Sequence, residues 1–183
     1  MKDHNYLKEK SSINIALIGH MGSGKTILGK LIAKKMNLKH IDSDRLIVKN
    51  SKKTINEIFE NEGESFFRKI EEKTILNLFD KENMVLSLGG GSILSKKTRV
   101  FLKEKFITVF LDVKMDILID RLKKSLKRPL LLGVNIKNNL EKIDIIRRKY
   151  YLSADIVLDN QENIDVTLKN FLEKYSSLDE KNY

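Results

Sequence analysis

Glycine, lysine and threonine residues near the start of the chain form a pattern that binds phosphate groups. Residues 19–26 read Gly-His-Met-Gly-Ser-Gly-Lys-Thr and match G-x-x-x-x-G-K-S/T, between an apolar run and an amphipathic segment. Because the loop binds phosphates through backbone N–H groups that its glycines turn inward, we expect no catalytic role for His20. Lys25 would reach the β- and γ-phosphates, and the Thr26 hydroxyl would bind Mg²⁺. The residues expected to bind the nucleotide here are Gly22, Ser23, Gly24, Lys25, Thr26 and Ile27.

The phosphate loop alone does not separate a kinase from a GTPase or a motor ATPase. An N-K-x-D segment, which reads the guanine base in GTPases, is absent from the sequence. The apolar run 84–88 leads into Gly89, Gly90 and Gly91, where a motor ATPase would have an acidic residue. At 183 residues the chain is also short for a motor. These features favour a kinase that acts on a small molecule.

Two carboxylates, Asp42 and Asp44, lie at the end of the second predicted strand. Side chains at i and i+2 of a strand point to the same side, here beside a phosphate loop. One could support the Mg²⁺ shell while the other takes a hydroxyl of the acceptor. The alternative is a polar strand-to-helix turn in which Asp44 only caps the next helix.

An arginine and a glutamate one helical turn apart form the third motif, in the segment 59–71. Arg68 precedes Glu71 by three residues, a spacing that suits an ion pair on one helix face. An arginine held in this way can bind a substrate carboxylate through two parallel hydrogen bonds. The alternative is an ordinary surface ion pair.

Short apolar runs alternate with longer segments of helical period along the chain. Because several runs are continuously apolar, they are typical of parallel strands that are buried on both faces. The predicted strands are 14–18, 40–42, 84–88, 107–111 and 156–158. The predicted helices are 25–36, 54–62, 64–80, 96–104, 115–124, 140–151 and 163–175, with Thr54 and Glu57 as a capping box. The pattern predicts an α/β fold whose ligands bind at the carboxyl ends of the strands.

Length and composition indicate one domain. With 41% hydrophobic residues, the chain can form a single core over 13–175, between polar tails at 1–12 and 176–183. The sequence has no cysteine, which fits a reducing cytoplasm and excludes disulfides and thiolate metal sites. No apolar run approaches the roughly 20 residues that span a bilayer, and no signal peptide is visible. We expect a soluble protein that does not bind membranes.

The net charge of +10 could suggest a nucleic-acid partner. However, the lysines are interleaved with acidic residues along the whole chain, tryptophan is absent, and no arginine-rich arm is present. The charge therefore indicates a solvated lysine surface, and we expect no nucleic-acid partner. A nucleotide-binding module without activity is a further alternative, against which the intact Lys25, Thr26, Asp44 and Arg128 argue.

Together these motifs resemble the shikimate kinase family. The phosphate loop, Asp-Ser-Asp, Phe-x-x-x-Gly-Glu-x-x-Phe-Arg-x-x-Glu, Leu-Gly-Gly-Gly and Arg-Pro-Leu-Leu occur in the family's order and spacing over 13–159. The resemblance implies a three-layer P-loop kinase fold with a five-stranded parallel sheet, acting as a monomer. It also implies a step of aromatic amino-acid biosynthesis, transfer of the γ-phosphoryl of ATP to the 3-hydroxyl of shikimate with Mg²⁺. A related kinase for another hydroxy acid, such as gluconate, is the alternative.

The resemblance also implies roles for residues of the acceptor site, within a substrate-binding segment at 42–71. Asp44 would orient the attacking hydroxyl and take its proton, and Asp42 would support Mg²⁺ through water. Arg68 and a second arginine would hold the substrate carboxylate, with Gly90 allowing close approach to the backbone. The family usually has Arg-x-Pro-x-Tyr for that second arginine, but residues 147–151 read Arg-Arg-Lys-Tyr-Tyr. Counting back from Ala154 and Asp155 favours Arg147, with Arg148 as the alternative.

The resemblance finally implies a lid over the nucleotide at about 123–135. Arg128, in Arg-Pro-Leu-Leu, would move onto the phosphates and act in catalysis with Lys25 and Asp44. Arg121 would stack on the adenine. A lid that excludes water prevents hydrolysis of ATP. The alternative is a surface loop without a role.

Overall fold

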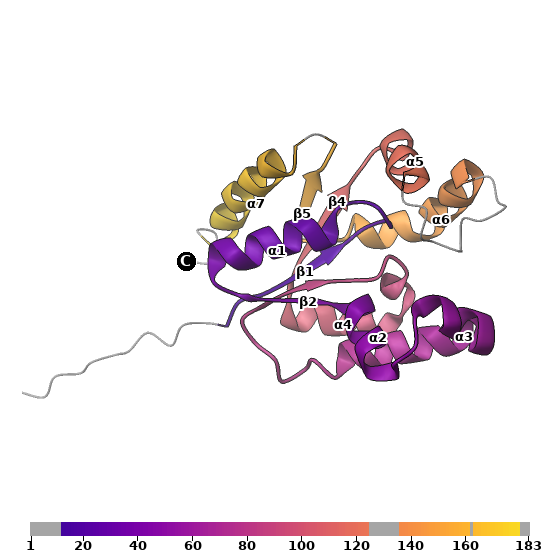
Figure 1. The fold of residues 1–183 in the computed structure, drawn as a ribbon. Coiled ribbons are helices and arrows are strands. Elements are labelled where there is room, and N and C mark those ends of the chain that lie inside the picture. The colour runs from indigo at the N-terminus through magenta and orange to yellow at the C-terminus, as the bar shows by residue number, and fades with distance from the viewer. Residues whose placement is uncertain (1–11, 125–135, 162, 180–183) are drawn as a thin grey trace, which may run out of the picture.

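A five-stranded parallel sheet forms the centre of the protein (Figure 1). The computed structural model describes residues 12–124, 136–161 and 163–179. The strand order is β2-β3-β1-β4-β5, so the strand before the phosphate loop lies in the middle of the sheet. The strands are β1 (Asn14–Ile18), β2 (Lys39–Asp42), β3 (Met84–Ser87), β4 (Ile107–Asp112) and β5 (Ile156–Asp159). All residues of β1 and β3 are buried, as expected for central parallel strands.

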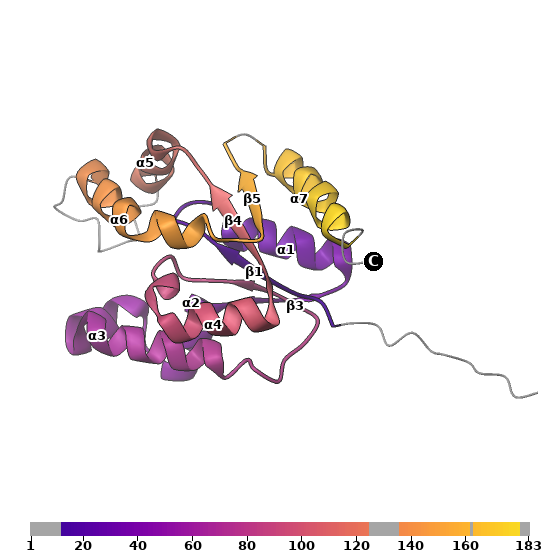
Figure 2. The same ribbon diagram turned by 180° about the vertical axis from the view of Figure 1, so that it is seen from behind.

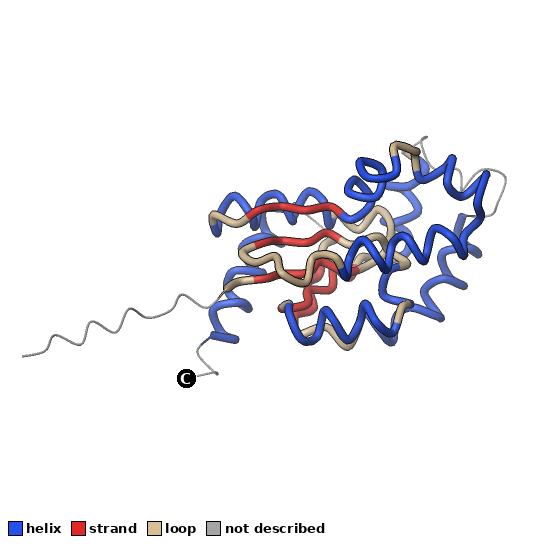
Figure 3. The backbone as a smooth tube through the Cα atoms, turned by 90° about the horizontal axis from the view of Figure 1, so that it is seen from below, coloured by secondary structure: helices blue, strands red, loops and turns tan. Residues whose placement is uncertain are grey.

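Helices cover both faces of this sheet, which makes three layers (Figures 1 and 2). On one face, Leu28 of α1 and Phe171 of α7 pack against Leu17. On the other face, Ile75 of α3 and Tyr151 of α6 pack in a second core, which α4 completes. Figure 3 shows the strands side by side between these helices. The helices are α1 (Lys25–Met36), α2 (Ser43–Ser51), α3 (Ile55–Leu76), α4 (Lys96–Lys105), α5 (Met115–Lys123), α6 (Ile136–Tyr151) and α7 (Ile164–Asp179), with a 3₁₀ turn η1 (Ser92–Leu94).

Two smaller cores lie at the carboxyl edge of the sheet. Ile47 of α2 packs against Ile58 and Phe67 of α3, and α5 packs against α6 through a separate apolar cluster. The chain bends within α3 at Gly63, whose φ of 81° and ψ of 169° are not helical. The sequence predicts that one helix ends before Gly63 and that the next begins after it. In the structure the two helical segments follow each other directly and meet in a kink at Gly63, because only glycine adopts this conformation at little cost.

The sequence predicts all five strands to within about one residue, and the capping box of Thr54 and Glu57 is confirmed. The prediction misses helix α2 entirely. The predicted C-terminal tail begins too early, because α7 continues to Asp179 and Leu178 packs against the core. Within the described part of the chain, no helix is both long enough and apolar enough to span a membrane.

Candidate active site

The phosphate loop lies between the end of β1 and the start of α1. Gly19, Gly22 and Gly24 have φ values of 139°, 81° and 97°, which residues with a side chain rarely adopt. Asn160, just after β5, donates from its side chain to the Ser23 carbonyl at 2.6 Å. This loop and the N-terminus of α1 form the expected cradle of backbone N–H groups.

The Lys25 ammonium group lies inside the phosphate loop. Its Nζ donates to the carbonyls of Gly19 at 2.8 Å and His20 at 2.7 Å. Only 9% of the residue is exposed, so the charge is held at the position where a nucleotide's phosphates would bind. Ile27, in the first turn of α1, is 60% exposed and would take part through its backbone.

The two residues expected to support Mg²⁺ contact each other. Thr26 Oγ1 donates to Asp42 Oδ2 at 2.7 Å, while Asp42 Oδ1 caps α2 by accepting from the Arg45 N–H at 3.1 Å. Hydroxyl and carboxylate oxygens fit Mg²⁺, which takes few protein ligands and keeps several waters or phosphate oxygens. The described residues contain no group of three or more acidic or histidine side chains that could hold a metal ion.

Asp44 lies in the first turn of α2 and not on a strand. The expectation that Asp42 and Asp44 alternate along one strand is therefore wrong, because the strand ends at Asp42. The alternative, in which Asp44 caps the helix, is also wrong, since Asp42 is the N-cap. Asp44 instead reaches the glycine loop after β3: a β-carbon on Gly89 would lie 2.6 Å from Asp44 Oδ1.

Residues 89–91 form a glycine loop against which three side chains of the candidate site lie. A β-carbon on Gly90 would lie 3.3 Å from the Gly19 carbonyl oxygen and 3.5 Å from an Arg147 guanidinium nitrogen. A β-carbon on Gly91 would overlap the Arg68 guanidinium. A side chain is disfavoured here because of this close approach, and not because of a positive φ. Arg68, Asp44 and Arg147 therefore converge beside the phosphate loop.

The ion pair of Arg68 and Glu71 is more buried than an ordinary surface pair. The two side chains are 27% and 3% exposed, with 2.6 Å between Nη1 and Oε2. Glu64 also contacts the guanidinium at 3.0 Å, and Ser92 donates to Glu71 at 2.6 Å. Burial alone would lower the pKa of Arg68, but the two carboxylates outweigh it and raise that pKa above its ordinary value. The guanidinium is held in place and charged.

The two neighbouring arginines of α6 have different surroundings. Arg148 donates to both Asp112 oxygens, at 2.9 and 3.3 Å, and is 3.7 Å from Asp144. Arg147 instead faces Gly90, whose carbonyl accepts a hydrogen bond from the Tyr151 hydroxyl at 2.6 Å. Burial raises the pKa of Tyr151 to about 12, so this hydroxyl stays a donor at neutral pH. The geometry favours Arg147 as the second arginine of the site.

Other predicted residues lie apart from this cluster. Arg121 reaches the carbonyls of Gly22 at 3.4 Å and Asn160 at 3.1 Å, next to the phosphate loop; its stacking on adenine stays a prediction. Arg128 and most of the predicted lid, 125–135, lie outside the described residues. Sequence reasoning missed Asn160, although a polar residue just past a predicted strand was a usable signal.

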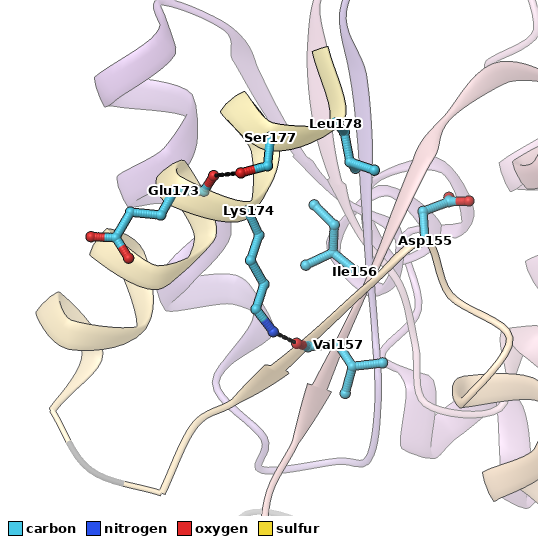
Figure 4. A pocket seen from close by; sticks show the side chains of 7 residues that line it. All are labelled: Asp155, Ile156, Val157, Glu173, Lys174, Ser177 and Leu178. Carbon is cyan, nitrogen blue, oxygen red and sulfur yellow. Dashed lines mark hydrogen bonds between the residues drawn. The ribbon is translucent and has the colours of Figure 1, made fainter. Parts of the chain in front are cut away.

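A separate pocket lies between β5 and α7, shown in Figure 4. Asp155, Ile156 and Val157 line it on the strand side, and Lys174 Nζ donates to the Val157 carbonyl at 2.7 Å. Because Asp155 precedes β5 and Ile156 and Val157 are its first two residues, the pocket is at the opposite end of the sheet from the phosphate loop. It does not belong to the candidate active site.

Fold and site together define the class of protein. A central strand of a parallel sheet leads into a phosphate loop, and carboxylate and arginine side chains converge at the same edge. This is the arrangement of a P-loop kinase that acts on a small molecule.

The chain belongs to the shikimate kinase family, whose sequence model matches residues 21–176. It is 42% identical over 151 residues to a shikimate kinase from Mannheimia succiniciproducens, covering 81% of this chain and 86% of that protein. The solved shikimate kinase from Acinetobacter baumannii, in complex with shikimate, has a TM-score of 0.86 at 32% identity, covering 91% of this chain and 95% of the other. The predicted fold and the predicted enzyme class, an ATP-dependent phosphotransferase, are confirmed.

A gluconokinase from Sinorhizobium meliloti is also similar, with a TM-score of 0.68 at 19% identity, covering 94% of this chain and 96% of that one. At this identity the likeness shows the shared fold alone. The gluconate alternative therefore gains no support beyond the fold.

Proposed function

We propose that this protein transfers the γ-phosphoryl group of ATP to the 3-hydroxyl of shikimate, giving shikimate 3-phosphate and ADP. The observation that carries the proposal is the convergence of Arg68, Arg147 and Asp44 on the glycine loop, beside the phosphate loop. Two guanidinium groups suit a carboxylate, and a nearby carboxylate suits a hydroxyl. The relative from Acinetobacter baumannii, solved with shikimate, supports this choice of acceptor.

On the nucleotide side, the loop N–H groups and Lys25 would bind the β- and γ-phosphates. Thr26 and Asp42 would hold Mg²⁺, which supplies positive charge next to the phosphates when bound. Arg121 would contact the adenine end. The transferred group carries spread negative charge in the transition state, so fixed positive groups such as Lys25 lower the barrier.

On the acceptor side, Arg68 and Arg147 would orient shikimate by its carboxylate. Asp44 would accept a hydrogen bond from the attacking hydroxyl and take its proton as the bond to phosphorus forms. Arg128, which would move onto the phosphates, and the lid at 123–135, which would exclude water, remain part of the proposal on the strength of the sequence.

We also propose the cytoplasm as the location and a monomer as the active form. ATP is available in the cytoplasm, and a chain without cysteine fits its reducing conditions. Neither nucleic acid nor a membrane surface is proposed as a partner. Light scattering of the purified protein at working concentration tests the monomer.

An acceptor screen tests the proposed function. The purified protein is given Mg-ATP with shikimate, quinate, gluconate or no acceptor, and ADP release is followed. We expect release that depends on shikimate and is much slower with the other three mixtures. Release that depends on gluconate, or on no acceptor at all, contradicts the proposal.

A further inference from the structure

We infer that His20 and Asp144 form a positioning contact through which the phosphate loop fixes the place of Arg147. This inference rests on the proposed function, because it assumes that Arg147 binds the acceptor's carboxylate. His20 is a positioning residue here and does not touch the reacting atoms.

The contact joins two segments that are far apart in the sequence. His20 Nε2 lies 2.7 Å from Asp144 Oδ1, and the histidine is only 4% exposed. The imidazole also packs edge-on against the Tyr151 ring, with 5.0 Å between ring centroids and 79° between ring planes. The side chain of His20 is therefore directed at α6, while its backbone belongs to the loop that would bind phosphates.

The electrostatics favour a neutral imidazole that donates to Asp144. Burial lowers the pKa of His20 below its ordinary value of 6.5, and the hydrogen bond and charge of Asp144 only partly oppose this. The positive charges of Lys25 and Arg147 lower that pKa further. Since a carboxylate can only accept, the proton lies on Nε2. A buried hydrogen bond to an ionised group is stronger than a neutral one.

Asp144 also contacts the arginine that joins α6 to the sheet. It lies 3.7 Å from Arg148 on the same helix, and Arg148 forms an ion pair with Asp112 at the end of β4. Asp144, Arg147, Arg148 and Tyr151 follow one another at i, i+3, i+4 and i+7, so they share one side of α6. This side is fixed to the phosphate loop by His20, to β4 by Arg148 and to the glycine loop by Tyr151. Removing the His20 contact should let Arg147 shift relative to Gly90.

The experiment compares H20F, D144N and the double variant. Phenylalanine keeps a flat ring against Tyr151 but removes the hydrogen bond. We expect H20F to raise the KM for shikimate about three- to tenfold, with little change in the KM for ATP. This is the size of effect found for residues that influence a binding site without touching the ligand. D144N keeps an oxygen that can accept from Nε2 and should be milder. The double variant should be no worse than H20F, because H20F already removes the contact on which D144N acts.

Two controls separate the possible outcomes. E141Q removes an exposed α6 carboxylate that lies 4.0 Å from Lys137, and it should leave both KM values unchanged. Equal rises in the KM for both substrates, or a shikimate KM in H20F no different from that in E141Q, would overturn the inference. An unchanged shikimate KM in R147K would remove the Arg147 assignment and this inference with it. A lack of any dependence on shikimate would instead remove the proposed function.

Discussion

Asp44 reaches the acceptor site from the first turn of α2, with Oδ1 against the backbone of Gly89. This position is more rigid than a strand end, because α2 is capped by Asp42 and its Ile47 is packed against α3. Asp42 in turn contacts Thr26 of the phosphate loop. At the scale of single residues, the segment 42–44 therefore positions both the proposed Mg²⁺-supporting acid, Asp42, and the proposed base, Asp44.

The variant D44N tests the proposed base. The amide cannot take a proton, so kcat should fall by about 10² to 10⁴, the usual contribution of a general base. ATP binding should stay close to that of the wild type, because Asp44 does not contact the phosphate loop in the proposed mechanism. Steady-state kinetics and titration with ATP measure the two effects. D116N, an exposed aspartate in the first turn of α5, is the matched control; near-normal turnover in D44N contradicts the assignment.

At the scale of elements, the glycine loop after β3 holds the site together. β3 lies between β1 and β2, so its carboxyl end lies between the phosphate loop and α2. Gly89, Gly90 and Gly91 approach Asp44, Arg147 and Arg68 in turn. The glycine loop thus forms one surface that side chains from α2, α3 and α6 contact.

The variant G91A tests whether the glycine loop positions Arg68 for the acceptor. Its β-carbon would overlap the Arg68 guanidinium, which must then leave its present place between Glu64 and Glu71. We expect kcat/KM for shikimate to fall about 10- to 100-fold, since misplacement of a positioning group by about 1 Å has this effect. The KM for ATP is the internal control. An unchanged kcat/KM for shikimate would show that Arg68 does not bind the acceptor.

At the scale of the whole molecule, folding buries His20 between the phosphate loop and helix α6. Because burial lowers the pKa of His20 below 6.5, the folded state resists its protonation more than the unfolded chain does. Below about pH 6.5 the unfolded chain therefore binds more protons, and the free energy of unfolding decreases as the pH falls through the folded pKa. Well above pH 6.5 His20 is neutral in both the folded and the unfolded state, so the free energy of unfolding keeps its full value.

Urea unfolding between about pH 7.5 and about pH 5 measures this dependence. We expect the wild type to lose stability on acidification and H20F to lose less, because phenylalanine does not titrate. An equal loss in both proteins would show that other groups account for the pH dependence.

The sequence by itself determined the sheet, most of the helices and the phosphate loop. These follow from apolar period, glycine placement and a motif of contiguous residues, which are local properties. The short β2 passes directly into α2 without a loop, and this left no signal to show that Asp44 is helical.

Only the tertiary structure decided which side chains meet. Arg147 and Arg148 are neighbours in the sequence, but they point about 100° apart around α6, and the packing of that helix decides which one faces Gly90. His20 contacts Asp144, which lies 124 residues further along the chain, and no local sequence pattern predicts this contact. Local sequence determines the elements, whereas the contacts between their side chains depend on how the elements pack.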